Sequence, residues 1–129
     1  MSAQLTMVER RTDFDNRVIS DWVRGLGFFN CTDIDWLVCP YDHSEPKALI
    51  EWKNESAPKL APDNPSISCM RELATRAKVP FFVVRWCNDL SHFIVHPLNM
   101  WAWKFCTDGR KPMSEETFKR FLKTIVEAI

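Results

Sequence analysis

IDWLV at residues 34–38 and ALIEWK at residues 48–53 are the two runs that decide the fold. Both consist mainly of apolar, strand-forming residues, and in both a charged residue interrupts the run. Successive side chains of a strand point to opposite faces, so Glu51 and Lys53 share one face and the apolar residues of their strand occupy the other. We therefore predict two strands, with one face packed in a core and the other carrying a carboxylate beside an ammonium group.

The segment between these runs, residues 40–46, has the proline and polar residues of a turn. It would allow the two strands to pair as a hairpin. By the same alternation Asp35 shares its face with Leu37, and in the hairpin Asp35 can approach Glu51 and Lys53. Two carboxylates and a lysine at one end of a sheet would form a divalent-metal site with a charge-stabilising partner.

The composition indicates a folded chain with no general attraction to anionic partners. At 129 residues the chain has the length of one domain, and its 46% hydrophobic content supports a core. We expect a single domain over residues 1–129, with residues 1–11 as a mobile lead-in. The 17 basic and 17 acidic residues cancel, so contact with nucleic acid must come from a local patch.

Cysteine usage and hydropathy bear on the cellular compartment. The chain has five cysteines, an odd number, with no Cys-x-x-Cys pair and no preceding secretory signal. This pattern favours a reducing compartment, and we expect the protein in the cytoplasm. No uninterrupted apolar run is long enough to span a bilayer, so no membrane association is expected.

Periodic apolar residues predict the remaining elements. Every fourth position from Phe14 to Leu26 is apolar, which is typical of an amphipathic helix. Asn64 before Pro65 predicts the cap and first position of a second helix, which extends to Lys78. Its buried stripe should consist of Ile67, Met70, Leu73, Ala74 and Ala77. The other expected elements are strands at residues 81–86, 93–95 and 101–105 and a C-terminal helix capped by Ser114.

The predicted order of elements indicates an α/β fold, with a central mixed β-sheet flanked by helices. The helix at residues 65–78 would cross over between two strands that run parallel. Trp22 and Trp36 are expected in the core. Trp101 and Trp103 would share one face of the last strand, where they could form an interface or stack on bases.

Cys87, His92 and His96 raise the question of a zinc site. The two histidines would lie at opposite ends of one strand, about 13 Å apart at the rise of a strand. This separation is too large for one ion, so we do not expect zinc there.

The order of elements and one motif together resemble the restriction-endonuclease-like PD-(D/E)XK nuclease superfamily. The motif consists of Asp35, a short gap and Glu51-Trp52-Lys53 at the end of the next strand, followed by a helix and an apolar strand. The likeness extends over residues 15–93, although the motif itself is short. It implies a restriction-endonuclease-like core and hydrolysis of phosphodiester bonds.

The resemblance also implies a divalent metal, usually Mg²⁺, with Mn²⁺ able to substitute. The carboxylates of Asp35 and Glu51 would bind the ion, with the backbone carbonyl of Trp52 as a further ligand. Lys53 would orient or activate the attacking water, or stabilise the pentacovalent phosphate. Many members add an acidic residue on the first helix, and Asp15 stands at the matching place. That position is more often glutamate, and an isoleucine precedes the strand aspartate here instead of proline.

Each candidate residue also has a simpler explanation. Asp15 lies in the first turn of its helix, where the helix dipole favours a carboxylate. Asp33 shares a face with Asp35 and is the rival metal ligand. Glu51 and Lys53 could form a salt bridge on an exposed edge.

Arg71, Arg76 and Lys78 are expected on the polar face of the second helix. By default they form a solvated helix surface. In a nuclease they would contact the phosphates of the substrate.

The sequence thus predicts a magnesium-dependent nuclease that acts on DNA, more specifically an endonuclease. Structure-specific cleavage, as in the compact Holliday-junction resolvases of the superfamily, is expected because no second domain is predicted that could recognise a sequence. Cutting two strands with one site per chain would favour a homodimer. The alternative is a non-catalytic protein that retains the nuclease fold and binds nucleic acid or modulates another enzyme, and the neutral net charge keeps this alternative open.

Overall fold

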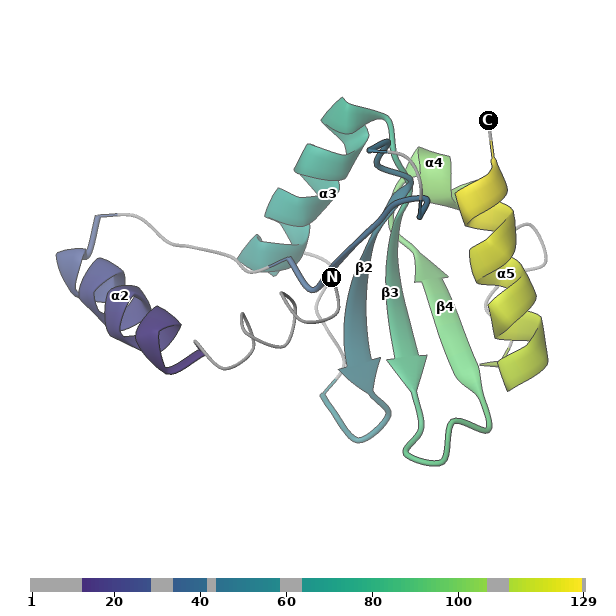
Figure 1. Cartoon of the computed structure of the whole chain (residues 1–129), viewed down its shortest axis with the longest axis horizontal. Helices are drawn as coiled ribbons and strands as arrows, with labels where there is room; N and C mark the ends of the chain where they lie inside the picture. Colours follow the sequence, from purple (N-terminus) through teal and green to yellow (C-terminus); the bar gives the residue numbers. More distant parts are fainter. Residues whose placement is uncertain (1–12, 29–33, 42–43, 59–63, 107–111, 129) are drawn as a thin grey trace. The chain divides into compact units, whose positions relative to one another are not determined.

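A computed structural model describes residues 13–28, 34–41, 44–58, 64–106 and 112–128 (Figure 1). The chain divides into two compact units, Met1–Asp33 and Ile34–Ile129, and each is described by itself. The expectation of one domain therefore stays a prediction, and the predicted lead-in at residues 1–11 lies outside the described residues. Within the described part of the chain, no helix has the length and apolarity needed to cross a bilayer.

The first unit contains the predicted amphipathic helix, α2 (Asp13–Leu26). It ends where Gly27 adopts a positive φ of 77°, a conformation that glycine enters without steric cost. The expectation that Trp22 lies in the core is wrong, since 63% of its surface is exposed. Both core clusters of the described residues consist of second-unit residues.

The second unit is built on a five-stranded mixed sheet in the order β1-β2-β3-β4-β5. The pairs β1–β2, β3–β4 and β4–β5 are antiparallel, and β2–β3 is parallel. The predicted hairpin and the predicted parallel crossover are both confirmed. The elements are β1 (Trp36–Val38), β2 (Ala48–Asn54), α3 (Pro65–Ala77), β3 (Phe81–Trp86), β4 (Phe93–Pro97), α4 (Met100–Trp103), β5 (Pro112–Met113) and α5 (Glu115–Glu127).

Helices α3 and α5 cover opposite faces of this sheet (Figure 1). The alternation of side chains along β2 separates the two faces, because Leu49 packs under α3 while Ala48 and Ile50 pack under α5. The cluster beneath α3 consists of Leu49, Ile67, Met70, Ala74, Val79, Phe81 and Val83. The cluster beneath α5 includes Ile50, Phe82, Val84, Phe93, Val95, Phe118, Phe121 and Ile125. The α/β class and the flanking helices are therefore as predicted.

Local capping explains where α3 and α5 begin. The side chain of Asn64 accepts a hydrogen bond from the backbone N–H of Ser66 at 3.0 Å, and Pro65 occupies the first helical position. Ser114 accepts one from the backbone N–H of Thr117 at 3.2 Å. Both caps were predicted. Two members of the predicted buried stripe of α3, Leu73 and Ala77, are instead exposed.

The predicted strand at residues 101–105 is wrong, because this segment begins with helix α4. The side chain of Asn99 accepts a hydrogen bond from the backbone N–H of Ala102 at 2.9 Å and thereby caps the helix. Trp101 and Trp103 therefore do not share a strand face. The edge of the sheet is formed by the short strand β5 instead.

The expectation that Trp36 lies in the core is also wrong, since 58% of its surface is exposed. Trp36 belongs to β1, which forms the opposite edge of the sheet and is only three residues long. Its ring and that of Trp52 form a T-shaped pair with a centroid distance of 5.4 Å. An edge strand of this length offers a tryptophan one neighbouring strand and leaves the rest of the ring in solvent.

Candidate functional site

Asp35 lies directly before β1, beside the second half of β2. The register Trp36↔Ile50 and Leu37↔Leu49, continued by one residue, places Asp35 opposite Glu51. The Asp35 carboxylate accepts a hydrogen bond through Oδ2 from the backbone N–H of Trp52 at 3.0 Å. The strand pairing itself ends at Trp36, and this hydrogen bond directs the Asp35 carboxylate to the β1 side of the β2 backbone, next to Trp52.

Glu51 and Lys53 point to the face that α3 covers, since they alternate with the residues under α5 and share the parity of Leu49. Both are half-buried, whereas Asp35 is exposed. Glu51 and Lys53 thus share one face of β2, while the Asp35 carboxylate lies at the backbone of Trp52 between them.

The backbone of Trp52 is oriented toward Asp35. Its N–H donates to the Asp35 side chain, and the N–H and C=O of one strand residue point to the same neighbouring strand. The carbonyl of Trp52 therefore faces the β1 side of β2, where Asp35 lies. The three groups predicted to bind a metal ion, two carboxylates and this carbonyl, are all oxygen donors.

Arg85 is a further basic residue at this site that sequence reasoning missed. It pairs with Lys53 in the parallel register of β2 and β3. Its Nη1 donates to the carbonyl of Ala57 at 3.1 Å and its Nη2 to that of Pro58 at 3.0 Å. Arg85 thereby anchors the loop that follows β2. A charged residue inside the apolar run FFVVRW was the available signal.

The three predicted substrate-binding residues occupy different environments on α3. Arg71 is half-buried in the middle of the helix, and Arg76 forms an exposed ion pair with Glu72 at 2.8 Å. Lys78 follows the helix with a positive φ of 61° and donates its backbone N–H to the last turn. The C-terminal end of α3 leads into the start of β3, so Arg76 and Lys78 lie toward the end of the sheet away from Lys53.

The side chains of the predicted Asp15 and of the rival ligand Asp33 lie outside the described residues. Asp15 belongs to α2 in the first unit.

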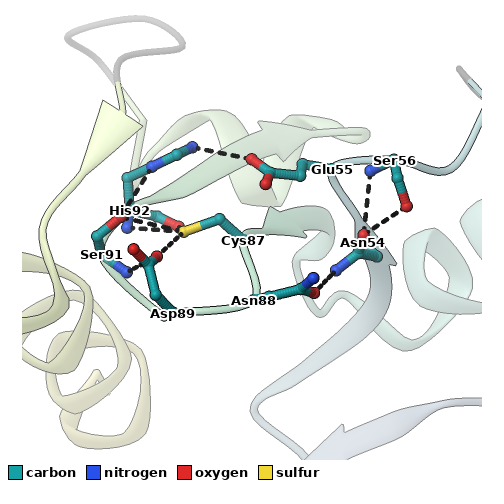
Figure 2. Close-up of polar contacts among 8 residues, drawn as sticks. All are labelled: Asn54, Glu55, Ser56, Cys87, Asn88, Asp89, Ser91 and His92. Carbon is teal, nitrogen blue, oxygen red and sulfur yellow. Dashed lines mark hydrogen bonds and ion pairs between the residues drawn. The ribbon is translucent and has the colours of Figure 1, made fainter.

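A second cluster of reactive side chains lies at the turns just beyond β2 and β3. One ligand atom each of Glu55, Cys87 and His92 lies within 4.8 Å of the others. Figure 2 shows Glu55, on the turn after β2, facing His92, which lies on the β3–β4 turn. Glu55 Oε2 and His92 Nε2 are 3.5 Å apart. His96 pairs with Val83 within the sheet and is not part of this group.

Sequence reasoning missed this cluster because it weighed Cys87 and His92 only with His96. Glu55 is more than 30 residues away in sequence and is brought in by the parallel register, in which its backbone N–H donates to the carbonyl of Trp86 at 2.8 Å. A prediction of that register, with Asn54 opposite Trp86, would have placed Glu55 beside Cys87.

Asp89 shapes the electrostatics of the same turn. Its carboxylate accepts hydrogen bonds from the Cys87 thiol at 2.9 Å and from the backbone N–H of Ser91 at 3.0 Å. The bond from Cys87, followed by those from Ser91, lowers the pKa of Asp89 to about 2. Asp89 is therefore ionised at neutral pH.

Comparisons with known proteins add nothing to these geometric observations. No family model matches the chain, and no curated protein or solved structure matches it.

Proposed function

We propose that the protein is a magnesium-dependent nuclease that hydrolyses phosphodiester bonds in DNA, with a restriction-endonuclease-like PD-(D/E)XK core. The observation that supports this proposal is the hydrogen bond from the backbone N–H of Trp52 to Asp35, which brings the Asp35 carboxylate to the part of β2 where Glu51 and Lys53 share a face. The α/β order around the hairpin is compatible with that superfamily, since a helix crosses over from β2 to the parallel strand β3.

The donor set fits a hard divalent ion. Mg²⁺ takes oxygen ligands and usually keeps several waters, so two carboxylates and one carbonyl leave positions for water and phosphate. The hydrogen bond from Trp52 engages Oδ2 of Asp35, which leaves Oδ1 as the oxygen to face a cation. Mn²⁺, which also accepts carboxylate and water ligands, should substitute.

Bound at this site, magnesium would reduce the repulsion between an anionic nucleophile and the anionic phosphate and increase the acidity of a bound water. Glu51 and Asp35 would hold the ion from two neighbouring strand positions. Lys53, half-buried on the same face as Glu51, would place a positive charge beside the phosphate or accept a proton from the attacking water.

The remaining basic residues would orient the substrate. Arg85 ties the loop after β2 to β3 through the carbonyls of Ala57 and Pro58, which fixes the rim of the site. Arg71 lies in the middle of α3, the helix that covers this face, whereas Arg76 and Lys78 lie toward the end of the sheet away from Lys53. Of the three predicted phosphate contacts, Arg71 is therefore the one nearest to the site along α3. Since the net charge is zero, binding would depend on such local groups.

We further propose structure-specific endonucleolytic cleavage, with a homodimer supplying two sites for two strands. The exposed apolar residues of the edge strand β1, Trp36 and Leu37, are available to such an interface.

A non-catalytic role is the second candidate, and one observation favours it. The hydrogen bond from Trp52 to Asp35 gives this carboxylate a structural task at the end of β1 that requires no metal ion. A protein that kept the fold for binding nucleic acid or modulating an enzyme could retain Asp35 for that reason alone.

A substrate panel separates the two candidates. The purified chain should be incubated with linear, circular, branched and single-stranded DNA, in Mg²⁺ or in chelator. A nuclease should cut at least one substrate in Mg²⁺ or Mn²⁺ and none in chelator, and Lys53→Ala should reduce cutting. If no substrate is cut while branched DNA is bound equally with and without metal ion, the non-catalytic role holds.

A further inference from the structure

The turns after β2 and β3 form a second polar cluster, and it contains none of the residues assigned to the proposed nuclease site. Glu55 comes from the first turn, while Cys87 and His92 begin and end the connection from β3 to β4. Hydrogen bonds hold the two turns against each other. The backbone N–H of Glu55 donates to Trp86 O at 2.8 Å. Asn54 Nδ2 donates to Asn88 Oδ1 at 2.7 Å (Figure 2).

The three ligand atoms of this cluster converge from different directions. The Cys87 sulfur is buried, with 3% of the residue exposed, while the side chains of His92 and Glu55 are 41% and 52% exposed. An ion could therefore enter from solvent on the side of His92 and Glu55 and meet the sulfur at the base of the turn.

The distances suit a tetrahedral ion. Zinc–ligand bonds place neighbouring ligand atoms about 3.3–3.8 Å apart in a tetrahedron. The separation of 3.5 Å between His92 Nε2 and Glu55 Oε2 falls in this range. All three ligand atoms lie within 4.8 Å of one another, so a closure of about 1 Å by the exposed Glu55 and His92 side chains would complete the geometry.

The surrounding hydrogen bonds are those that support metal ligands. Ser91 Oγ lies 3.3 Å from His92 Nδ1, which would fix the ring with Nε2 toward the ion. The backbone N–H of His92 donates to the Cys87 sulfur at 3.3 Å, an arrangement that stabilises a thiolate. Cys87, Ser91 and Asp89 form one contiguous network around this sulfur (Figure 2).

We propose that Glu55, Cys87 and His92 form a zinc site that fastens the β2–α3 loop to the β3–β4 turn. Sulfur, imidazole and carboxylate are the donors that zinc accepts together, whereas magnesium prefers oxygen alone. Three protein ligands leave a fourth position for water. On binding, the Cys87 thiol loses the proton with which it donates a hydrogen bond to Asp89, the proton leaves to solvent, and the thiolate binds the ion.

The simpler explanation of the cluster is a surface ion pair between Glu55 and His92 beside a buried thiol. It predicts no metal affinity. The two explanations therefore differ in a quantity that can be measured on the intact chain, whatever the outcome for the nuclease site.

Cobalt(II) is the probe of choice, since its thiolate bonds give a charge-transfer absorption and its visible bands report tetrahedral coordination. Titration of the full-length chain with Co²⁺ should produce both signals at one ion per chain, and Zn²⁺ should displace them. Cys87→Ser should abolish the charge-transfer band, and His92→Gln and Glu55→Gln should each weaken binding more than about 100-fold, beyond the loss expected for a supporting residue such as Ser91. Cys69→Ser, which changes an exposed cysteine on α3, is the matched control and should bind as the wild type does.

His92→Gln and Glu55→Gln change exposed side chains, so they keep the test decisive if Cys87→Ser does not fold. Zinc should also raise the melting temperature of the wild type and of Cys69→Ser, but not that of His92→Gln. A wild-type chain that shows no charge-transfer band would overturn the proposal. So would a His92→Gln or Glu55→Gln variant that binds cobalt as tightly as the wild type.

Discussion

The carboxylate of Asp35 carries a structural and a proposed catalytic role at once. Because β1 begins at Trp36, the Asp35 side chain takes the place of a strand carbonyl and accepts the N–H of Trp52. Such a hydrogen bond contributes about 0.5–1.5 kcal/mol to the free energy of unfolding. Asp35→Ala would remove this bond and the proposed metal ligand at the same time. Asp35→Asn keeps an acceptor oxygen and removes the charge, and it is therefore the informative substitution.

The burial of Cys106 should make its thiol slow to react with alkylating reagents. Burial raises the pKa of the Cys106 thiol to about 11, so at pH 8 only about 0.1% of it is ionised. Native alkylation with iodoacetamide, followed by peptide mass spectrometry, should therefore modify the exposed Cys39 and Cys69 well before Cys106. Unfolding in urea should remove the difference, and a Cys106 that reacts as fast as Cys39 in the native protein would contradict it.

The same pKa has a consequence for stability. In the unfolded chain the Cys106 thiol ionises near pH 9, whereas in the folded protein it ionises only near pH 11. As the pH rises above 9, the unfolded state loses its proton first, so the free energy of unfolding should fall between pH 9 and pH 11. Cys106→Ser should show a smaller decrease over this range in urea titrations.

Single residues show which parts of the site the sequence could disclose. The shared face of Glu51 and Lys53 follows from the alternation of one strand, which is local information. The group of Glu55, Cys87 and His92 depends on the register between two strands, which no local pattern contains. Residues 55 and 87 could be joined only after the parallel pairing was known.

At the scale of elements, prediction succeeded where capping chemistry and periodicity agreed. Helices α3 and α5 have both signals, from Asn64 with Pro65 and from Ser114. Helix α4 was mistaken for a strand because its two tryptophans alternate with other residues. The segment is helical because Asn99 caps it. The side chain of Asn99 is held in place by hydrogen bonds with Phe81 and Val79, which are far away in the sequence.

Asn99 should accordingly be a stability-determining residue. It is buried, with 7% exposed, and its Oδ1 accepts the backbone N–H groups of Phe81 and Ala102 while its Nδ2 donates to Val79 O. Asn99→Ala would leave buried donors of β3 and α4 without this acceptor and should lower the free energy of unfolding by about 2–4 kcal/mol. Urea denaturation followed by circular dichroism measures this loss.

Asn88→Ala provides the matched comparison for Asn99. Asn88 is exposed, and its Oδ1 accepts a hydrogen bond from Asn54 Nδ2 at 2.7 Å. Its substitution should cost less than about 1 kcal/mol. Equal losses for Asn88→Ala and Asn99→Ala would show that the buried amide does not organise the β3–α4 junction.

At the scale of the whole molecule, the hairpin and the crossover were predictable, whereas the edge strand β5 and the burial of the edges were not. A helix between two apolar strands predicts a parallel crossover, and β2–α3–β3 forms one. Nothing in the sequence indicated that Trp36 would lie on an edge strand or that α2 would belong to a separate compact unit. Apolar periodicity predicts a face that can be buried, not what covers it.

The division into two units leads to a prediction about stability. Every residue of both core clusters lies between Ala48 and Ile125, within the second unit. A fragment that starts at Ile34 should therefore unfold cooperatively, with a free energy of unfolding within about 1 kcal/mol of the whole chain, roughly one hydrogen bond. A fragment without cooperative unfolding in urea would show that the first unit stabilises the second.

That fragment also tests the predicted contribution of Asp15. If Asp15 adds a carboxylate to the nuclease site, the folded fragment should lose cleavage, and Asp15→Asn in the full chain should lose it to the same extent. If Asp15 serves only the dipole of α2, Asp15→Asn should cleave as the wild type does.

The central claim is that Asp35, Glu51 and Lys53 form one hydrolytic site. Its most direct test is the rate of Mg²⁺-dependent cleavage of a branched DNA by the wild type and by Glu51→Gln, with the exposed Glu116→Gln on α5 as the control. We predict that Glu51→Gln lowers this rate more than about 100-fold while its melting temperature and the rate of Glu116→Gln remain at wild-type values. A Glu51→Gln variant that cleaves as fast as the wild type, or a wild type that does not cleave DNA in Mg²⁺, would contradict the claim.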